Sequence, residues 1–263
     1  MKHIFCTSAA LALCVAASGS VALAAPQHHR MRVPAYITAA VNNTSRPESD
    51  RSRDAGRKPA AVLTFAGVKP GMRIGELEPQ GEYYTRLLCR IVGNSGHDYG
   101  VNFRPHFPPP RPGAPARPRR ARPKPAPLGC DNVTLSMQEA SQLTLPSNLD
   151  MVWTSDNYHD IHNPFFGKPN MMTFDRTIYD ALKPGGVFIV LDHAAAAGTG
   201  ASDTNTLHRI DPALVKKEAE AVGFKLVAHS NVLRNRHDNH TMIVFKMHDK
   251  TDRFLFKFRK PAT

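Results

Sequence analysis

The chain has 263 residues, of which 41% are hydrophobic and 21% are charged, and its 34 Lys and Arg against 22 Asp and Glu give a net charge of +12. This composition excludes a chain that is disordered throughout and one that is mostly embedded in a membrane, and the length favours one main domain. Its 22 prolines outnumber its 17 glycines. The positions of the prolines and positive charges therefore decide how the net charge is interpreted.

The first 24 residues have the pattern of a signal peptide. Lys2 and His3 precede an apolar run from Ile4 to Val21, and Ala22-Leu23-Ala24 fits an A-x-A cleavage site. No later stretch approaches the roughly 20 apolar residues of a transmembrane helix. We therefore predict cleavage near Ala24 and a mature chain that is periplasmic or secreted.

Cleavage would leave two cysteines, Cys89 and Cys130, in an oxidising compartment. Two thiols there can form one disulfide, whereas a catalytic thiol would need a nucleophile motif that this sequence lacks. Sequence alone does not place the two Cα atoms within bridging distance, so the pairing stays open.

Residues 25–50 form an N-terminal segment, and the predicted domain at 51–263 contains a proline- and arginine-rich loop insertion at 104–127. The insertion holds ten Pro, six Arg and Lys124 but no Asp or Glu. Because proline fixes φ and lacks an amide donor, we expect a solvated loop with polyproline II character. Its positive charge would suit contact with a polyanion, but Phe107 is its only aromatic residue, so a solvated spacer is the alternative.

Outside the insertion, strand patterns alternate with helix patterns. Apolar strand patterns occur at 73–77, 99–103, 132–135, 149–154, 187–191, 224–230 and 254–259. Helical periodicity occurs at 84–91, at 171–178 before the stop Lys183-Pro184-Gly185-Gly186, and from the Asp211-Pro212 cap to Gly223. This order predicts an α/β fold, a doubly wound, Rossmann-like, mostly parallel seven-stranded sheet with an antiparallel last strand.

Several motifs fall at the carboxyl ends of the predicted strands. The first strand runs into Glu76-Leu77-Glu78-Pro79-Gln80-Gly81-Glu82-Tyr83-Tyr84-Thr85, Asn157-Tyr158-His159-Asp160 follows the fourth strand, and Asp192-His193 ends the fifth. With Lys69-Pro70-Gly71-Met72 and Leu182-Lys183-Pro184-Gly185-Gly186, this order of motifs resembles class I S-adenosylmethionine-dependent methyltransferases, and in particular an exported bacterial branch of them. The resemblance covers roughly residues 51–261 outside the insertion.

The resemblance implies S-adenosylmethionine as the cofactor and suggests which residues hold it. The implied cofactor-binding residues are Glu76, Gln80, Gly81, Tyr84, Asn102, Asp156, Asn157 and Tyr158. In the family the first turn is rich in glycine, whereas this chain keeps only Gly81 and has Gln80 and Glu82 at glycine positions. Asn102 stands where many relatives have an acid for the ribose hydroxyls.

Methyl transfer to an O–H or N–H acceptor needs a nearby base. His159 is the first choice for that base with Asp160 as its orienting partner, and Asp192 and His193 are the reserve pair. The alternative is that these are hydrogen-bonded loop residues. The spacing His159-x-x-His162 also suits a metal, with Asp192, His193 or His208 as possible third ligands, but nothing fixes a complete ligand set, so no metal is assigned.

Two functions follow from these observations. The first is an S-adenosylmethionine-dependent methyltransferase that acts on an unknown small molecule or envelope component. The second is a catalytically inactive, methyltransferase-like binding protein of the periplasm with a degenerate cofactor loop, because a fold alone does not certify a reaction.

Overall fold

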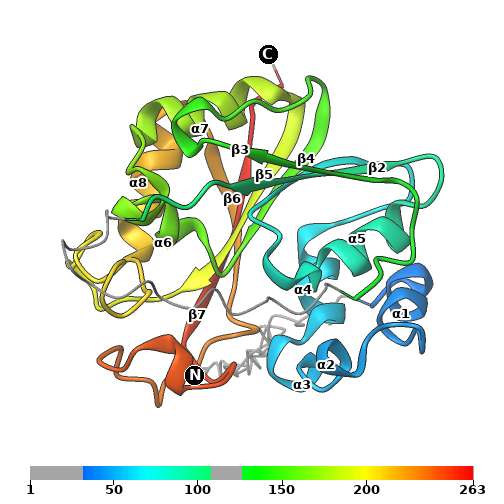
Figure 1. The fold of residues 1–263 in the computed structure, drawn as a ribbon, viewed down its shortest axis with the longest axis horizontal. Helices are drawn as coiled ribbons and strands as arrows, with labels where there is room; N and C mark the ends of the chain where they lie inside the picture. The colour runs from blue at the N-terminus through cyan, green and yellow to red at the C-terminus, as the bar shows by residue number, and fades with distance from the viewer. Residues whose placement is uncertain (1–31, 108–125, 263) are drawn as a thin grey trace, which may run out of the picture. The chain divides into compact units, whose positions relative to one another are not determined.

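The computed structural model describes residues 32–107 and 126–262, so the predicted signal peptide and most of the insertion lie outside it. Within these ranges, seven strands form one sheet in the order β3-β2-β1-β4-β5-β7-β6 (Figure 1). The strands are β1 (Arg73–Leu77), β2 (His97–Phe103), β3 (Val133–Gln138), β4 (Leu149–Ser155), β5 (Leu182–His193), β6 (Lys225–Ser230) and β7 (Arg253–Arg259).

The direction of the strands confirms the predicted fold class. The pairs β1-β2, β2-β3, β1-β4 and β4-β5 are parallel, whereas β7 is antiparallel to both β5 and β6. The strand order reverses at β1 and β4, and in doubly wound sheets the carboxyl ends of such strands border a ligand crevice.

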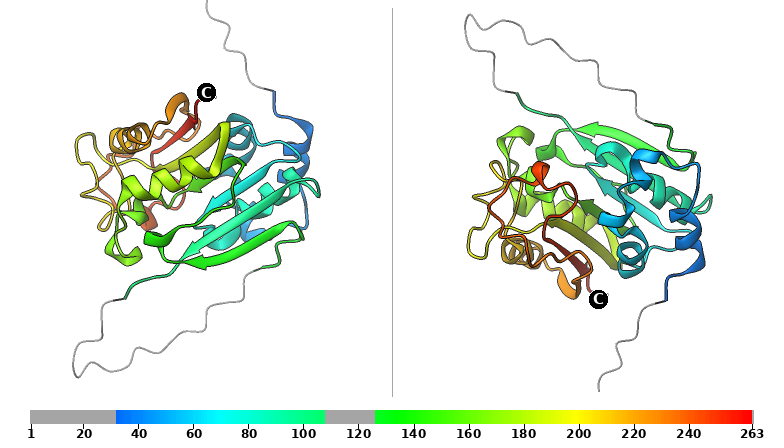
Figure 2. Two further views of the ribbon diagram at one scale, coloured as in Figure 1. Left: turned by 90° about the horizontal axis from the view of Figure 1, so that it is seen from above. Right: turned by 90° about the horizontal axis from the view of Figure 1, so that it is seen from below.

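Helices cover both faces of the sheet (Figure 2). They are α1 (Ala35–Val41), α2 (Glu48–Arg51), α3 (Asp54–Arg57), α4 (Pro59–Ala66), α5 (Thr85–Val92), α6 (Tyr158–Ile161), α7 (Met171–Ala181) and α8 (Pro212–Ala221). Short 3-10 turns lie at η1 (Gln80–Glu82), η2 (Ala140–Gln142), η3 (Pro164–Phe166) and η4 (Val244–Lys246). No helix in the described ranges is both long enough and apolar enough to cross a bilayer.

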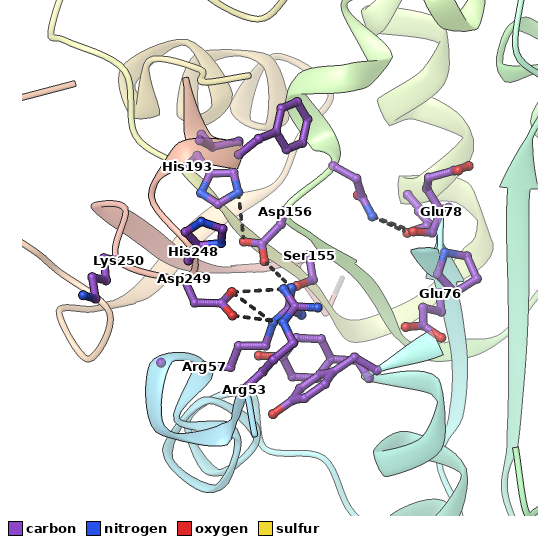
Figure 3. Close-up of a pocket in the computed structure, with 18 of the residues that line it drawn as sticks. Arg53, Arg57, Glu76, Glu78, Ser155, Asp156, His193, His248, Asp249 and Lys250 are labelled. Atoms are coloured by element: carbon purple, nitrogen blue, oxygen red, sulfur yellow. Dashed lines mark hydrogen bonds and ion pairs between the residues drawn. The ribbon is translucent and has the colours of Figure 1, made fainter. Parts of the chain in front are cut away.

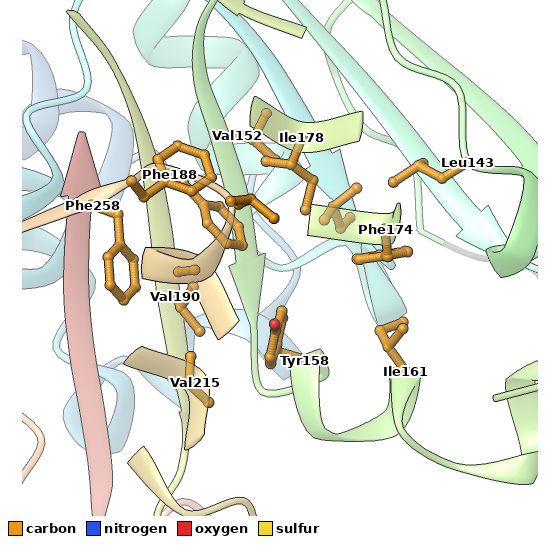
Figure 4. Packing of buried hydrophobic residues seen from close by; sticks show 14 of the residues in the cluster. Leu143, Val152, Tyr158, Ile161, Phe174, Ile178, Phe188, Val190, Val215 and Phe258 are labelled. Atoms are coloured by element: carbon orange, nitrogen blue, oxygen red, sulfur yellow. The ribbon is translucent and has the colours of Figure 1, made fainter. Parts of the chain in front are cut away.

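The central strands divide their side chains between two apolar cores. Val152 of β4 and Phe188 of β5 face the core under α7 and α8 (Figure 4). Their neighbours Trp153 and Ile189 point the other way, into the core under α4 and α5. Because both faces are buried, these strands are almost continuously apolar.

Strand β5 is longer than the sequence predicts. The expected strand at 187–191 extends back to Leu182 and includes the Lys183-Pro184-Gly185-Gly186 motif that was expected only to stop a helix. The predicted end of the helix before this motif is correct, because α7 ends at Ala181. The strand continues through the motif because Gly185 N–H donates to the carbonyl of Lys260 (3.0 Å), and Lys260 N–H to that of Gly186 (2.9 Å).

The described residues before β1 contribute to the core. Ile37 of α1 and Leu63 of α4 are fully buried beside α5. A buried ion pair between Asp50 of α2 and Arg86 of α5 (2.8 Å) joins the same elements. Residues 35–66 therefore form part of the helical layer on this face.

Cys89 of α5 and Cys130 before β3 form a disulfide, which answers the question that the sequence leaves open. The described flanks of the insertion are also attached to the domain. His106 N–H donates to the carbonyl of Phe165 (2.7 Å), and Arg86 Nη1 donates to that of Ala126 (3.3 Å).

Candidate functional site

A cavity of about 740 Å³ lies at the carboxyl ends of β1 and β4, where the strand order reverses. Its other walls come from α3 and from residues 244–250 before β7 (Figure 3). This volume is typical of small-molecule sites. The lining residues are Ser52, Arg53, Gly56, Arg57, Glu76, Leu77, Glu78, Pro79, Tyr83, Tyr84, Ser155, Asp156, Asn157, His193, Val244, Phe245, His248, Asp249 and Lys250.

Five of these residues, which we call the cavity wall, come from four parts of the fold. They are Arg57 at the end of α3, Tyr84 before α5, Ser155 and Asp156 at the end of β4, and His193 at the end of β5. The carboxyl ends of parallel strands share one edge of the sheet, which is why residues distant in sequence meet there.

Asp156 lies at the centre of an ionic network. Its carboxylate pairs with Arg57 (3.3 Å) and Arg253 (3.6 Å), and Arg57 also pairs with Asp249 (3.3 Å). Burial raises the pKa of Asp156, but the His193 ring and the Arg253 and Arg57 guanidinium groups outweigh burial and lower this pKa to about 2. Asp156 is therefore ionised throughout the neutral pH range.

Three oxygen atoms of the cavity wall are buried without a hydrogen-bond partner among the described residues. They are Tyr84 Oη, Ser155 Oγ and Asp156 Oδ1. An unsatisfied buried polar group costs about 1–3 kcal/mol, and folded proteins rarely leave one. A polar ligand or ordered water in the cavity would satisfy these atoms.

His193 presents an imidazole to the cavity beside Asp156 (Figure 3). Its Nδ1 hydrogen bonds with Thr251 Oγ1 (2.8 Å), and its Nε2 lies 3.8 Å from Asp156 Oδ1. Burial lowers the pKa of His193 to about 4 in spite of Asp156 and Asp192. The ring is therefore neutral at pH 7, and when Nδ1–H donates to Thr251, Nε2 can accept a proton.

The turn after β1 places two carboxylates on left-handed backbone. Glu78 (φ 48°) and Glu82 (φ 59°) lie on either side of Gly81 (φ 65°). Such a φ favours glycine, and a residue with a Cβ pays a backbone penalty. Glu82 pairs with Arg86 (2.9 Å), and Glu78 Oε2 accepts the N–H of Phe103 (2.5 Å). Glu78 thereby brings a carboxylate to the carboxyl end of β2.

Glu76 belongs to a buried acidic pair. It accepts a hydrogen bond from Thr85 Oγ1 (2.6 Å), and its carboxyl group interacts with that of the buried Asp98 of β2. Burial raises the pKa of Glu76 to about 7, and burial together with Glu76 raises the pKa of Asp98 well above its ordinary value. The pair therefore retains a proton at pH values where exposed carboxyl groups have lost theirs.

Of the residues predicted to hold the cofactor, Glu76, Tyr84, Asp156 and Asn157 line the cavity. Asn157 also ties the two strand ends together, because its Nδ2 donates to the carbonyls of Leu77 (3.1 Å) and Glu78 (2.7 Å). Gly81, Asn102 and Tyr158 are not among the lining residues. The structure does not describe the side chain of Gln80, so its predicted contact with the cofactor stays a prediction.

Sequence reasoning did not single out Arg57 or Glu78 as site residues. Arg57 lies on a four-residue helix and reaches the cavity through long-range contacts, so no local motif marks it. Glu78 is the first residue after β1. A carboxylate at the carboxyl end of a parallel strand indicates a ligand site, so the sequence could have identified Glu78.

His159, Asp160 and His208 form a second polar cluster, which we call the histidine triangle. His159 Nε2 lies 3.3 Å from both Asp160 Oδ1 and His208 Nδ1, and the latter two atoms are 3.1 Å apart. The predicted base His159 and its partner Asp160 thus lie together, but neither is among the residues that line the cavity. The ring of His159 lies 5.9 Å from that of His193.

Asp192, at the end of β5, supports both histidines that the sequence singled out. Its carboxylate accepts the backbone N–H groups of His159 (2.8 Å) and His193 (2.7 Å) and bonds with His159 Nδ1 (2.8 Å). Burial lowers the pKa of His159, but Asp192 and Asp160 outweigh burial and raise it to about 10. Burial alone would raise the pKa of Asp160, which the two histidines hold well below its ordinary value.

Tyr158 points into a different network, under α7 and α8. Its Oη hydrogen bonds with Asp175 Oδ2 (2.8 Å) and Glu218 Oε2 (3.1 Å), and His162 Nε2 bonds with Glu218 (3.0 Å). Burial raises the pKa of Asp175 to about 8. The polar atoms of Tyr158 and His162 therefore have hydrogen-bond partners on α7 and α8.

No model of a protein family matches this sequence, and no curated protein matches it. Solved structures do resemble it. A SAM-dependent methyltransferase from Aquifex aeolicus is 16% identical with a TM-score of 0.51, and the match covers 80% of this chain and 93% of that one. A putative sarcosine dimethylglycine methyltransferase from Galdieria sulphuraria is 15% identical with a TM-score of 0.52, and the match covers 81% and 88%.

A third similar structure is the [4+2]-cyclase SpnF, which is 14% identical with a TM-score of 0.53 over 84% of this chain and 86% of that one. One fold can thus carry different reactions, and the argument for function must come from the site. At these identities the comparisons establish architecture. The chain has the fold of class I S-adenosylmethionine-dependent methyltransferases.

Proposed function

We propose that this protein is an S-adenosylmethionine-dependent methyltransferase whose cofactor binds in the cavity at the ends of β1 and β4, with a small molecule or envelope component as the acceptor. The cavity wall carries the proposal. Tyr84 Oη, Ser155 Oγ and Asp156 Oδ1 are buried and lack hydrogen-bond partners among the described residues, and all three residues line a cavity of about 740 Å³. The cavity lies at the topological switch point of a methyltransferase fold, where such sheets bind ligands.

The charges around the cavity fit the groups of this cofactor. Arg57 offers a guanidinium for the carboxylate, and Asp156 offers an acceptor for the ammonium group. Glu78 supplies a carboxylate at the end of β2, where Asn102 has none, for the ribose hydroxyls. The bound cofactor would supply a methyl group on a sulfonium, which is transferred by in-line displacement, so the protein mainly has to align the reactants.

The protein's own contribution is alignment and proton removal. Arg57 is held in place by Asp156 and Asp249, and its guanidinium lies 4.7 Å from the centre of the Tyr83 ring. We place the base at His193, from the reserve pair, because it lines the cavity and its ring is neutral at pH 7, whereas His159 does not line the cavity.

A binding protein without turnover is the second candidate function. The left-handed Glu78 and Glu82 support it, because they put negative charge and Cβ atoms into the turn where the family has glycine. Such a protein would bind S-adenosylmethionine, or only S-adenosylhomocysteine, without transferring a methyl group.

Calorimetric titration of the mature protein with S-adenosylmethionine and S-adenosylhomocysteine tests the proposal. We expect saturable binding that Arg57→Ala weakens at least about 10-fold, since it removes a charge-assisted contact. Arg51→Ala is the matched control, because Arg51 is 41% exposed and pairs only locally with Glu48. Absence of binding at millimolar ligand, or equal loss in both variants, would overturn the cofactor assignment.

The base assignment needs a separate readout. In an assay of S-adenosylhomocysteine release with envelope extracts, His193→Ala should lower turnover far more than cofactor affinity. Equal losses in both would make His193 a structural residue. Binding without any release would favour the second candidate function.

We also propose that the protein acts after export. The support is the pattern of residues 1–24 and the Cys89–Cys130 disulfide, a bond typical of oxidising compartments. Contact with a polyanion through residues 104–127 stays a prediction, because residues 108–125 lie outside the described ranges.

A further inference from the structure

We propose that the histidine triangle is a binding site for a divalent transition-metal ion, with Zn²⁺ as the preferred ion. The ligand atoms are His159 Nε2, Asp160 Oδ1 and His208 Nδ1. Two imidazole nitrogens and one carboxylate oxygen form a donor set that suits Zn²⁺ and its first-row neighbours. This assignment lies outside the cofactor cavity and does not depend on methyltransferase activity.

The spacing of the three atoms matches tetrahedral coordination. Their separations are 3.3, 3.3 and 3.1 Å, which makes an almost equilateral triangle. Ligands about 2.0–2.1 Å from a tetrahedral zinc ion lie about 3.3 Å from one another. The separations therefore suit an ion that lies just above the plane of the triangle.

The surroundings of His159 orient it as a ligand. Its Nδ1 lies 2.8 Å from Asp192 Oδ1, so a proton on Nδ1 is held there, and Nε2 faces the triangle, where an ion would replace the proton on Nε2. A carboxylate behind a metal-binding histidine fixes the tautomer and ring orientation in this way. The same carboxylate accepts the backbone N–H of His159 (2.8 Å), which fixes the start of α6 as well.

The site is accessible and incomplete, as a metal site with an external ligand should be. His159 is buried, but the His208 side chain is 26% exposed and the Asp160 side chain 15%, so an ion can enter from that side. Among the described residues, the group of potential ligands has three members, which leaves a fourth position for water or a substrate oxygen.

The triangle lies next to the cavity. The ring of Phe245, which lines the cavity, packs 4.6 Å from the ring of His208, and the ring of His193 lies 5.9 Å from that of His159. A metal ion here would also join α6 to the segment between β5 and α8. It would thereby restrain the part of the fold next to His193.

The test uses the mature protein, freed of metal with a chelator, and measures Zn²⁺ binding by calorimetry and Co²⁺ binding by visible absorption. We expect one ion per chain and the intense absorption of four-coordinate Co²⁺. His208→Ala and Asp160→Asn should each raise the Kd for Zn²⁺ at least about 100-fold, and Asp192→Asn about 10–100-fold, as loss of an orienting residue does.

His106→Ala is the control, because this half-exposed histidine pairs with Glu139 (2.6 Å) away from the triangle. It should bind Zn²⁺ like the parent protein, and circular dichroism should show that each variant is folded. The proposal is wrong if the parent protein shows no saturable Zn²⁺ binding, or if the two ligand variants and the control have the same Kd. In that case protons, and no ion, connect the three atoms.

Discussion

The cavity wall and the histidine triangle lie side by side at the same edge of the sheet, yet they are built in opposite ways. In the wall, Tyr84 Oη, Ser155 Oγ and Asp156 Oδ1 have no hydrogen-bond partner among the described residues. In the triangle, each ligand atom lies within 3.3 Å of the other two. The difference teaches that two kinds of site leave different marks: a site for a polar organic ligand has polar atoms whose hydrogen-bond partners are missing, whereas a metal site has ligand atoms that converge on one point.

The largest expected effect tests whether the triangle region depends on its hydrogen bonds for stability. Asp192→Ala removes the acceptor of two backbone N–H groups and the partner of the His159 ring at a fully buried position. Loss of one partner of a buried polar pair costs about 3–5 kcal/mol. Urea denaturation should show a loss of this size, and the exposed Asp131→Ala should change the free energy of unfolding by less than about 0.5 kcal/mol.

A change of pH should alter the free energy of unfolding by a similar amount, because of Glu76, which lines the cavity. Because the folded state holds the Glu76 proton more tightly than the unfolded state does, the free energy of unfolding is greatest below the ordinary pKa of 4.5 and falls as the pH rises through about 7. The difference between these pKa values corresponds to on the order of 3 kcal/mol.

Asp98→Asn should reduce this pH dependence and stabilise the protein at pH 8, because it removes the carboxylate next to Glu76. The carboxyl oxygens of Asp98 have no hydrogen-bond partner among the described residues, and Glu76 is the carboxyl group that interacts with Asp98. Urea titrations at pH 4.5, 6 and 8 measure the slope. A variant with the same slope as the parent protein would show that the two carboxyl groups do not interact.

Two neighbouring tyrosines give a smaller and sharper contrast. Tyr83 Oη donates to Asp54 (2.5 Å), so Tyr83→Phe should destabilise the protein by about 1.5–3 kcal/mol. Tyr84→Phe removes an unpartnered hydroxyl, so the ligand-free protein should keep or slightly gain stability while its affinity for S-adenosylmethionine falls. If Tyr84→Phe were as destabilising as Tyr83→Phe, Tyr84 Oη would have a partner in the ligand-free protein and would not mark the cavity wall as a ligand site.

The smallest effect concerns the turn after β1. Glu82→Ala loses the ion pair with Arg86 and keeps the left-handed backbone, whereas Glu82→Gly loses the same pair and relieves that backbone. The glycine variant should therefore be about 1 kcal/mol more stable than the alanine variant. Equal stability of the two variants in urea would mean that the turn relaxes when the ion pair is lost.

Most of the sheet can be predicted from the sequence, because strand and helix patterns are local. Trp153 and Ile189 lie in apolar runs that indicate strands buried on both faces. The extension of β5 back to Leu182 could not be predicted. It depends on hydrogen bonds to Lys260, and no local pattern at Pro184 indicates such a partner.

The site is predictable only in part, for a related reason. The motifs after β1 and β4 identify Tyr84 and Asp156, because those motifs are contiguous in sequence. Arg57 joins them through contacts with Asp249, 192 residues further along the chain, and no pattern around either residue connects the two. The sequence marks His159 as part of a polar loop and as a candidate base, but only the fold shows that His159 is not among the residues that line the cavity.

The disulfide between Cys89 and Cys130 determines what a protease can do to the protein. The two cysteines are 41 positions apart, and the proline- and arginine-rich insertion lies between them. A protease that cuts the chain within the insertion therefore produces two pieces that stay covalently joined. Nicked molecules would run as one band on a non-reducing gel and as two after reduction, so proteolysis within the insertion need not release any part of the domain.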